Sequence, residues 1–233
     1  MLMFADRREA GKELAKELAA YRDEENTIVL GLPRGGVPVA FEVARALNLP
    51  LDIMLVRKLG VPGFEELAMG AIADGGVQIL NQETIAGLGI APHRIDDVIA
   101  KENAELQRRG KLYRGNRKPP DLRGMTVILV DDGVATGSGM RAAIRAAREQ
   151  GAKCVAVAVP TAPEDVYEMF SDIADEVVCC HMPEVFFGVG DMYRDFSQTR
   201  DKEVIELLNT AFIKPRAAMG RHRDGEKSGQ PFS

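Results

Sequence analysis

The run from Val127 to Met140 (VILVDDGVATGSGM) constrains the fold of this chain more than any other segment. Its first four residues are continuously apolar, as in a buried strand of a parallel sheet, and the segment from Ser138 onward is rich in helix formers. The two acids and the glycines between these elements therefore lie in a strand-to-helix loop. Open α/β sheets bind their ligands at that edge, so the run predicts an α/β fold with a ligand site there.

The loop combines donors for a phosphate with acceptors for sugar hydroxyls. Its glycines allow tight turns, so that backbone N–H groups and the hydroxyls of Thr136 and Ser138 can converge on one phosphate near a helix N-terminus. Two adjacent acids cannot serve that phosphate; they suit the hydroxyls of an attached ribose, or a cation held by it. An ordinary turn with surface acids is the alternative. No Gly-Lys-Ser/Thr follows, which excludes a Walker A loop.

Length and composition limit the remaining classes. A chain of 233 residues with 45% hydrophobic content can build one full α/β domain and a small lobe. The formal net charge of −5 gives no global field for nucleic acid, so the positive charge that an anionic ligand needs must be clustered. The three cysteines have neither zinc nor disulfide spacing and predict reduced, buried thiols. The absence of a long apolar run and of a signal-like start predicts a cytoplasmic protein without membrane contact.

Apolar periodicity predicts alternating strands and helices. We expect strands at 27–32, 51–56, 68–72, 77–80, 127–130, 154–159 and 176–180, and helices at 6–21, 36–46, 92–113, from 138, 163–170 and 204–212. The helix over 92–113 should lie outside the main sheet. We expect one domain over 1–213, with a core at about 26–180, a hood at about 181–200 that the N-terminal segment is a candidate to join, and a disordered tail over 214–233.

The motif resembles the phosphoribosyl-pyrophosphate (PRPP) motif of the type I phosphoribosyltransferases, which has four hydrophobic residues, two acids and a loop of the form x-x-(A/T)-T-G-x-(T/S). The final hydroxyl residue of that pattern falls on Gly139 here, and Ser138 stands one place earlier. The resemblance spans about Asn26 to Phe196. It implies the type I phosphoribosyltransferase fold, a central parallel sheet flanked by helices with a small hood, here with an inserted long helix.

The same resemblance implies a reaction and its residues. A nitrogen of a base, a purine being one candidate, would displace pyrophosphate from PRPP with the help of Mg²⁺. Binding of the 5′-phosphate would fall to Ala135, Thr136, Gly137, Ser138 and Gly139. The catalytic acids would be Asp131 and Asp132, which would contact the ribose and meet the metal mainly through PRPP or water, with Asp132 a candidate to assist proton removal. A homodimer is implied only by the resemblance to the family. DNA is not expected as a partner, because the sequence contains no helix-turn-helix domain.

Two further segments supply positive charge for pyrophosphate. Arg34, Gly35 and Gly36 follow the first core strand and lead into a helix; by resemblance they form the pyrophosphate loop, which often has an unusual peptide geometry. Arg57 and Lys58 end the second strand, and the Gly and Pro after them suggest a mobile loop like that of adenine phosphoribosyltransferases. The alternatives are a tight turn with an exposed arginine and solvated charges at a strand end.

For two segments, the sequence is compatible with either a functional or a purely structural role. Phe186 and Phe187 resemble the hood aromatics that cover a purine base, but they could equally cap the core against the C-terminal helix. The basic run over 107–118 could close over PRPP, reach a neighbouring subunit's site, contact RNA, or simply form a solvated helix end. That run is the only sequence support for an alternative function, a non-catalytic PRPP sensor that regulates a partner or an RNA.

Overall fold

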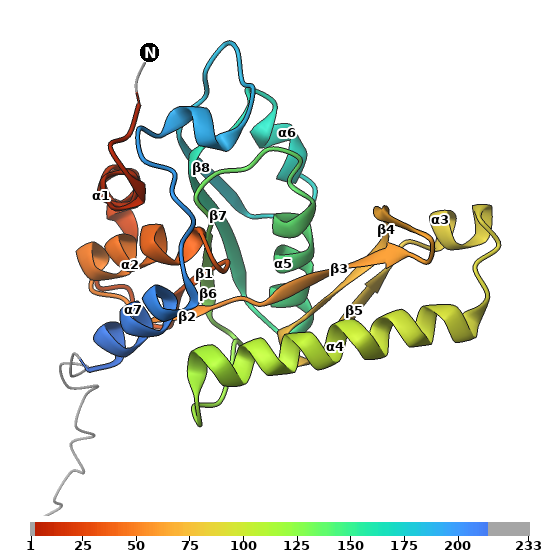
Figure 1. The fold of residues 1–233 in the computed structure, drawn as a ribbon. Helices are drawn as coiled ribbons and strands as arrows, with labels where there is room; N and C mark the ends of the chain where they lie inside the picture. The colour runs from red at the N-terminus through yellow and green to blue at the C-terminus, as the bar shows by residue number, and fades with distance from the viewer. Residues whose placement is uncertain (1–2, 214–233) are drawn as a thin grey trace, which may run out of the picture.

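The computed structural model describes residues 3–213 and has a five-stranded parallel sheet at its centre. The strand order is β2-β1-β6-β7-β8, and helices cover both faces of the sheet (Figure 1). The strands are β1 (Thr27–Gly31), β2 (Leu51–Ile53), β6 (Thr126–Val130), β7 (Cys154–Thr161) and β8 (Glu176–His181). This is the α/β fold with a central parallel sheet that the sequence predicts.

Strands β1 and β6 lie side by side at the centre because both are apolar along their whole length. Gly31 pairs with Val130 at the carboxyl ends of the two strands, and the N–H of Leu32 donates to the carbonyl oxygen of Val130 at 2.8 Å. Parallel neighbours end at the same edge of a sheet. The loop after β1 is therefore fixed beside the loop after β6, which carries the two acids.

The helices form two layers. On one face lie α1 (Arg7–Glu17) and α2 (Gly36–Leu47), and α7 (Asp201–Ile213) packs beside α2 (Figure 1). On the other face lie α5 (Ser138–Glu149) and α6 (Val166–Phe170). Each layer buries its own apolar cluster against the sheet, and alternate residues of β6 point into the two clusters, with Val127 and Leu129 in one and Ile128 and Val130 in the other.

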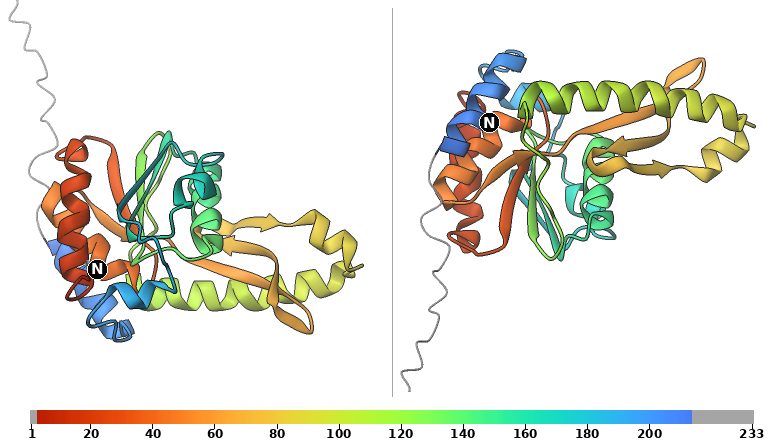
Figure 2. Two further views of the ribbon diagram at one scale, coloured as in Figure 1. Left: turned by 90° about the horizontal axis from the view of Figure 1, so that it is seen from above. Right: turned by 90° about the horizontal axis from the view of Figure 1, so that it is seen from below.

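A second unit projects from the core as an arm (Figure 2). It consists of an antiparallel sheet of β3 (Val56–Val61), β4 (Phe64–Ala73) and β5 (Val77–Leu80), with α3 (Gln82–Gly87) and α4 (Pro92–Arg114). Short 3₁₀ turns occupy Ala19–Tyr21, Asp74–Gly76 and Val189–Met192. The long helix lies outside the main sheet, as expected, and no helix within residues 3–213 is long and apolar enough to cross a membrane.

The arm corrects the predicted second strand. The strand expected at 51–56 ends at Ile53, and Val56 begins β3 in the separate antiparallel sheet. The residues after Arg57, which the Gly and Pro signals suggested to be a mobile loop, instead form a hairpin with β4, which is longer than the expected 68–72 strand. The predicted disordered tail over 214–233 lies outside the described residues.

A buried network of charges anchors the arm to the core. Arg114 ends α4, and its Nε donates to Oδ1 of Asp52 in β2 at 2.7 Å. Its Nη2 donates to the carbonyl oxygen of Ile53 at 2.7 Å and to Oδ2 of Asp74, after β4, at 2.8 Å. The side chain of Arg114 is only 4% exposed, so the guanidinium is fully committed to this joint.

This network includes part of the basic run over 107–118. Besides the buried Arg114, Arg108 and Arg109 both pair with Glu105 of the same helix. Arg117 donates to main-chain oxygens, among them the carbonyl of Arg114 at 3.1 Å. These arginines have partners within the arm or at its joint with the core, and the role of the run in binding stays a prediction.

Candidate active site

The motif loop delivers its hydroxyls to the start of a helix. Helix α5 begins at Ser138, directly after Gly137, which has a φ of 69° that favours glycine. Oγ1 of Thr136 and Oγ of Ser138 lie 3.4 Å apart. A side chain on Gly139 would point into open space, since no atom lies within 4 Å of the position that its Cβ would take. Ser138 is therefore the residue that brings a second hydroxyl to Thr136.

The two acids have different surroundings. The N–H of Asp132 donates to Oδ1 of Asp131 at 2.8 Å, which turns the Asp131 carboxyl back over the end of β6. Burial, and then the neighbouring charge of Asp132, raise the pKa of the Asp131 carboxyl well above its usual value. The Asp132 carboxylate instead receives an ion pair from Arg7 of α1, with Nε and Oδ2 2.8 Å apart. The two neighbouring carboxyls interact with each other but have different partners, since only Asp132 is paired with an arginine.

A cavity of about 250 Å³ lies where the motif, the loop after β1 and the arm meet. Asp131 lines this cavity together with residues from all three segments, and the segments supply both anionic and cationic groups. The other lining residues are Leu32, Pro33, Met54, Val56, Lys58, Ala68, Gly70, Ala71, Ser138, Gly139 and Ala142. The cavity therefore joins the predicted phosphate loop to Lys58 of the arm.

The loop after β1 approaches the motif so closely that a Cβ on either of its two glycines would clash with it. The peptide bond between Pro33 and Arg34 is cis, and helix α2 begins at Gly36. A Cβ on Gly35 would lie 2.0 Å from Oδ2 of Asp132, far inside van der Waals contact. The side chain of Arg34 is not among the cavity-lining residues; its Nη1 lies 3.7 Å from Oδ1 of Asp201 at the start of α7.

Arg57 and Lys58 point to opposite sides of β3, as successive strand residues must. Lys58 is among the residues that line the cavity, and its Nζ donates to the carbonyl oxygen of Glu66 at 3.1 Å and lies 3.6 Å from Oε2 of Glu66. Arg57 donates from Nε to Oε2 of Glu102 in α4 at 2.8 Å. The two cations therefore do not act as a pair at one sheet edge: Lys58 lines the cavity, and Arg57 braces the long helix.

The predicted base-binding aromatics also separate. Phe186 packs against the cluster of Phe4, Met192 and Tyr193, whereas Phe187 is 85% exposed. Neither residue lines the cavity beside the motif. In the structure, Phe186 caps an apolar cluster, although against the N-terminal segment and not against the C-terminal helix that the sequence suggested.

Sequence reasoning missed two residues that contact the motif. Arg7 pairs with Asp132 across 125 positions of sequence. Tyr193 donates from its hydroxyl to the carbonyl oxygen of Asp132 at 2.5 Å, and burial followed by the Asp132 charge raises the pKa of this phenol. Nothing local to either residue indicates the contact; only the expectation that the N-terminal segment joins the hood pointed in this direction.

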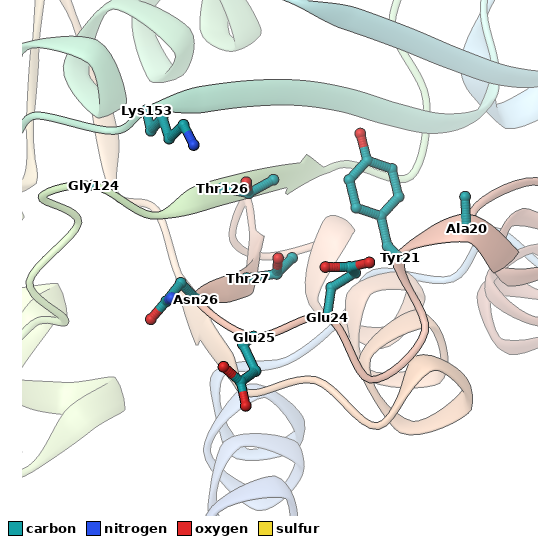
Figure 3. Close-up of a pocket in the computed structure, with 9 residues that line it drawn as sticks. All are labelled: Ala20, Tyr21, Glu24, Glu25, Asn26, Thr27, Gly124, Thr126 and Lys153. Carbon is teal, nitrogen blue, oxygen red and sulfur yellow. The ribbon is translucent and has the colours of Figure 1, made fainter. Parts of the chain in front are cut away.

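A second cavity, of about 320 Å³, lies at the amino ends of β1 and β6 (Figure 3). Polar side chains line it, including Tyr21, Glu24, Thr27, Thr126 and Lys153. It contains none of the residues that the sequence predicts for binding or catalysis. Because ligands of parallel α/β sheets bind at the opposite, carboxyl edge, this cavity is not part of the candidate active site.

Asp131 and Asp132 could supply only part of the coordination of a magnesium ion. Among residues 3–213, no group of three or more His, Cys, Asp or Glu side chains is placed to hold a metal. Asp131 and Asp132 offer two carboxylates, and one of them already pairs with Arg7. Mg²⁺ characteristically keeps several waters and binds through one or two carboxylates plus substrate phosphates. The donor set fits a metal that arrives with a phosphorylated substrate.

Comparison with known proteins agrees with the class of protein that this sheet, loop and cavity define. The family model described as phosphoribosyl transferase domain matches residues 5–197. The chain therefore belongs to the phosphoribosyl transferase family, as the motif led us to expect.

Individual relatives extend this result. A protein of Mycobacterium tuberculosis, strain H37Rv, whose name assigns it provisionally as a phosphoribosyl transferase, is 46% identical over 229 residues, which is 98% of this chain and 49% of that protein. The chain thus spans about half the length of this curated relative. The crystal structure of TT1426 from Thermus thermophilus is 41% identical and superposes with a TM-score of 0.78, covering 89% of this chain and 98% of that one. The bifunctional protein PyrR of Chloroflexus aurantiacus is 32% identical over 120 residues, 51% of this chain and 60% of that protein.

Proposed function

We propose that this protein transfers the 5-phosphoribosyl group of PRPP to a nitrogen of a base, a purine being one candidate, and releases pyrophosphate in an Mg²⁺-dependent reaction. The observation that carries the proposal is the cavity shared by Asp131, Ser138 and Lys58. It brings a carboxylate, the first residues of a helix and a lysine to one cavity, and PRPP offers hydroxyls, a phosphate and a pyrophosphate.

The 5′-phosphate end is assigned to the loop before α5. Ser138 is the first residue of that helix, and the first N–H groups of a helix have no partner within it. Those N–H groups, the positive end of the helix dipole and the paired hydroxyls of Thr136 and Ser138 together attract one phosphate. Ala135, Gly137 and Gly139 contribute backbone to this cradle.

The pyrophosphate end is assigned to Lys58 and to the loop of Arg34, Gly35 and Gly36. In the reaction, a bond forms between the base nitrogen and C1′ of ribose, and the bond from C1′ to the pyrophosphate oxygen breaks with its electron pair. Charge therefore grows on the leaving group. Lys58 lines the cavity, and its ammonium would have to leave Glu66 to neutralise that charge. Arg34 would have to leave Asp201 to assist, whereas Arg57 is held at Glu102.

The two acids divide their roles. Asp131 lines the cavity and is assigned to the ribose hydroxyls. It is also the better placed acid to take the proton from the base, because Asp132 faces Arg7. Asp131 and Asp132 would hold a bound Mg²⁺ together with the substrate, and the ion would supply positive charge that neutralises the phosphates. No protein nucleophile is required, since the protein holds the two reactants in line.

The test is pyrophosphate release from PRPP and Mg²⁺ with a panel of purine and pyrimidine bases. We expect release with one class of base, and its loss in Asp131→Asn. PRPP binding without turnover on any base would favour the alternative, a non-catalytic PRPP sensor. A thermal-shift screen with nucleotides names the acceptor independently, because a product that binds the native state raises the melting temperature.

A further inference from the structure

Backbone hydrogen bonds connect the N-terminal segment to the hood beside the candidate active site. The N–H of Phe4 donates to the carbonyl oxygen of Met192 at 2.9 Å, and the N–H of Arg194 donates back to the carbonyl oxygen of Phe4 at 2.9 Å. Asp6 then caps α1, because its side chain accepts from the N–H groups of the second and third helical residues. Arg7 is thereby fixed as the first residue of α1, at the boundary between hood and core.

The hydrogen-bond partners that the structure shows for the Arg7 side chain belong to the motif or to the hood. Its Nε donates to Oδ2 of Asp132 at 2.8 Å, and its Nη1 donates to the carbonyl oxygen of Ser197 at 2.7 Å. The guanidinium lies over the ring of Phe196, 4.0 Å from the ring centre, and that ring stacks on Tyr193. The side chains of Arg7 and Asp132 are 11% and 15% exposed.

This arrangement controls where the second acid of the motif points. Asp132 is held between Arg7 and the backbone of Gly35, and it does not line the cavity that Asp131 lines. Without the guanidinium, the Asp132 carboxylate would be a partly buried charge without its ion pair. Rotation toward water would then bring a second carboxylate closer to the cavity assigned to the phosphates of PRPP, where like charges repel.

We propose that Arg7 is a positioning residue for PRPP binding, which holds Asp132 against the loop of Gly35 and keeps its charge neutralised while Asp131 faces the substrate. This inference rests on the proposed function. It adds α1 and the aromatic pair of Phe196 and Tyr193 to the active site, although none of them belongs to the PRPP motif.

The experiment is a calorimetric titration of Mg²⁺-PRPP into the full chain and its variants. Arg7→Gln should weaken PRPP binding by about tenfold, the lower end of the loss seen when a group that orients a metal-binding side chain is removed. The PRPP affinity of Arg7→Lys should lie between those of the wild type and Arg7→Gln. An ammonium keeps the positive charge, but it has neither the planar guanidinium geometry nor the stacking on Phe196. Lys12→Gln removes an exposed charge from the same helix and should bind like wild type. Wild-type affinity in Arg7→Gln overturns the proposal.

A double-mutant cycle separates this role from a merely structural one. If Arg7 acts through Asp132, Arg7→Gln should change PRPP affinity far less in an Asp132→Asn background than in the wild type. Equal losses in the two backgrounds would show that Arg7 does not act through Asp132 and would overturn the proposal.

A third variant, Phe196→Leu, tests the same role if the first two variants cannot be measured. Should Arg7→Gln not fold, or Asp132→Asn not bind PRPP, Phe196→Leu serves instead, since it removes the ring beneath the guanidinium and leaves both charges in place. Wild-type affinity in both Phe196→Leu and Arg7→Lys would overturn the proposal, and weakened binding in both supports it. Wild-type protein that binds no PRPP refutes the proposed function itself, whereas binding that ignores Arg7 refutes only this inference.

Discussion

Replacing Arg114 by methionine tests the joint between arm and core. The substitution keeps an unbranched side chain of similar length but removes three hydrogen bonds, to Asp52, Ile53 and Asp74. Breaking a buried ion pair from one side generally costs about 3–5 kcal/mol, because a charge is left buried without a partner.

The structure places Arg114→Met near the lower end of that range. The Asp52 side chain is 21% exposed, so water can reach its carboxylate. Asp74 keeps one donor, the N–H of Leu55 at 3.1 Å. We therefore expect a loss of about 3 kcal/mol in the free energy of unfolding. In a domain of this size, that corresponds to a fall of about 6–12 °C in melting temperature.

Urea unfolding followed by circular dichroism measures this loss, and the chain has no tryptophan to follow by fluorescence. The matched control adds Asp52→Asn and Asp74→Asn to Arg114→Met. Because the control leaves no unpaired charge, it should recover most of the lost stability. A loss of less than about 0.5 kcal/mol in Arg114→Met would show that this joint does not hold the arm, since ordinary surface substitutions produce changes of that size.

Three further predictions concern the site and the thiols. Gly35→Ala should destroy PRPP binding, because its Cβ would lie 2.0 Å from a carboxylate oxygen of the motif, whereas Gly139→Ala, with open space around its Cβ, should fold and melt like wild type. Lys58→Ala should weaken inhibition by pyrophosphate by about tenfold, the worth of one charged hydrogen bond; unchanged inhibition would remove Lys58 from the site. Burial raises the pKa of Cys179 to about 11 and of Cys180 to about 12, so alkylation by iodoacetamide at pH 8 should be slow and should accelerate as pH rises toward those values or on unfolding; rapid labelling of the native protein would contradict this.

The parts of the fold that could be predicted from the sequence are those fixed by local pattern. The continuous apolar run of β6 and the helix formers from Ser138 place the motif loop at the sheet edge, where the structure has it. The antiparallel β3 could not be predicted in the same way. Its charged pair and the Gly and Pro beyond it resemble a loop, and the strand forms because Leu59 and Val61 are buried when it pairs with β4.

Ion pairs between residues far apart in the sequence could not be predicted either. Arg7 meets Asp132 only because α1 starts beside the hood, and Arg114 finds Asp52 and Asp74 only once α4 has packed along the arm. In each case the partners have no fixed spacing along the chain. The sequence could therefore indicate that positive charge had to be clustered, but it could not show which carboxylate each cation pairs with, or that Lys58 is the cation that lines the cavity.

Calorimetric titration of Mg²⁺-PRPP shows whether PRPP binds in the cavity beside Asp131. We predict saturable binding to one site in the wild-type chain, competition by pyrophosphate, and a strong loss of affinity in Asp131→Asn with the fold intact by circular dichroism. Absence of saturable binding by the wild type, or equal affinity in wild type and Asp131→Asn, would show that PRPP does not bind beside Asp131.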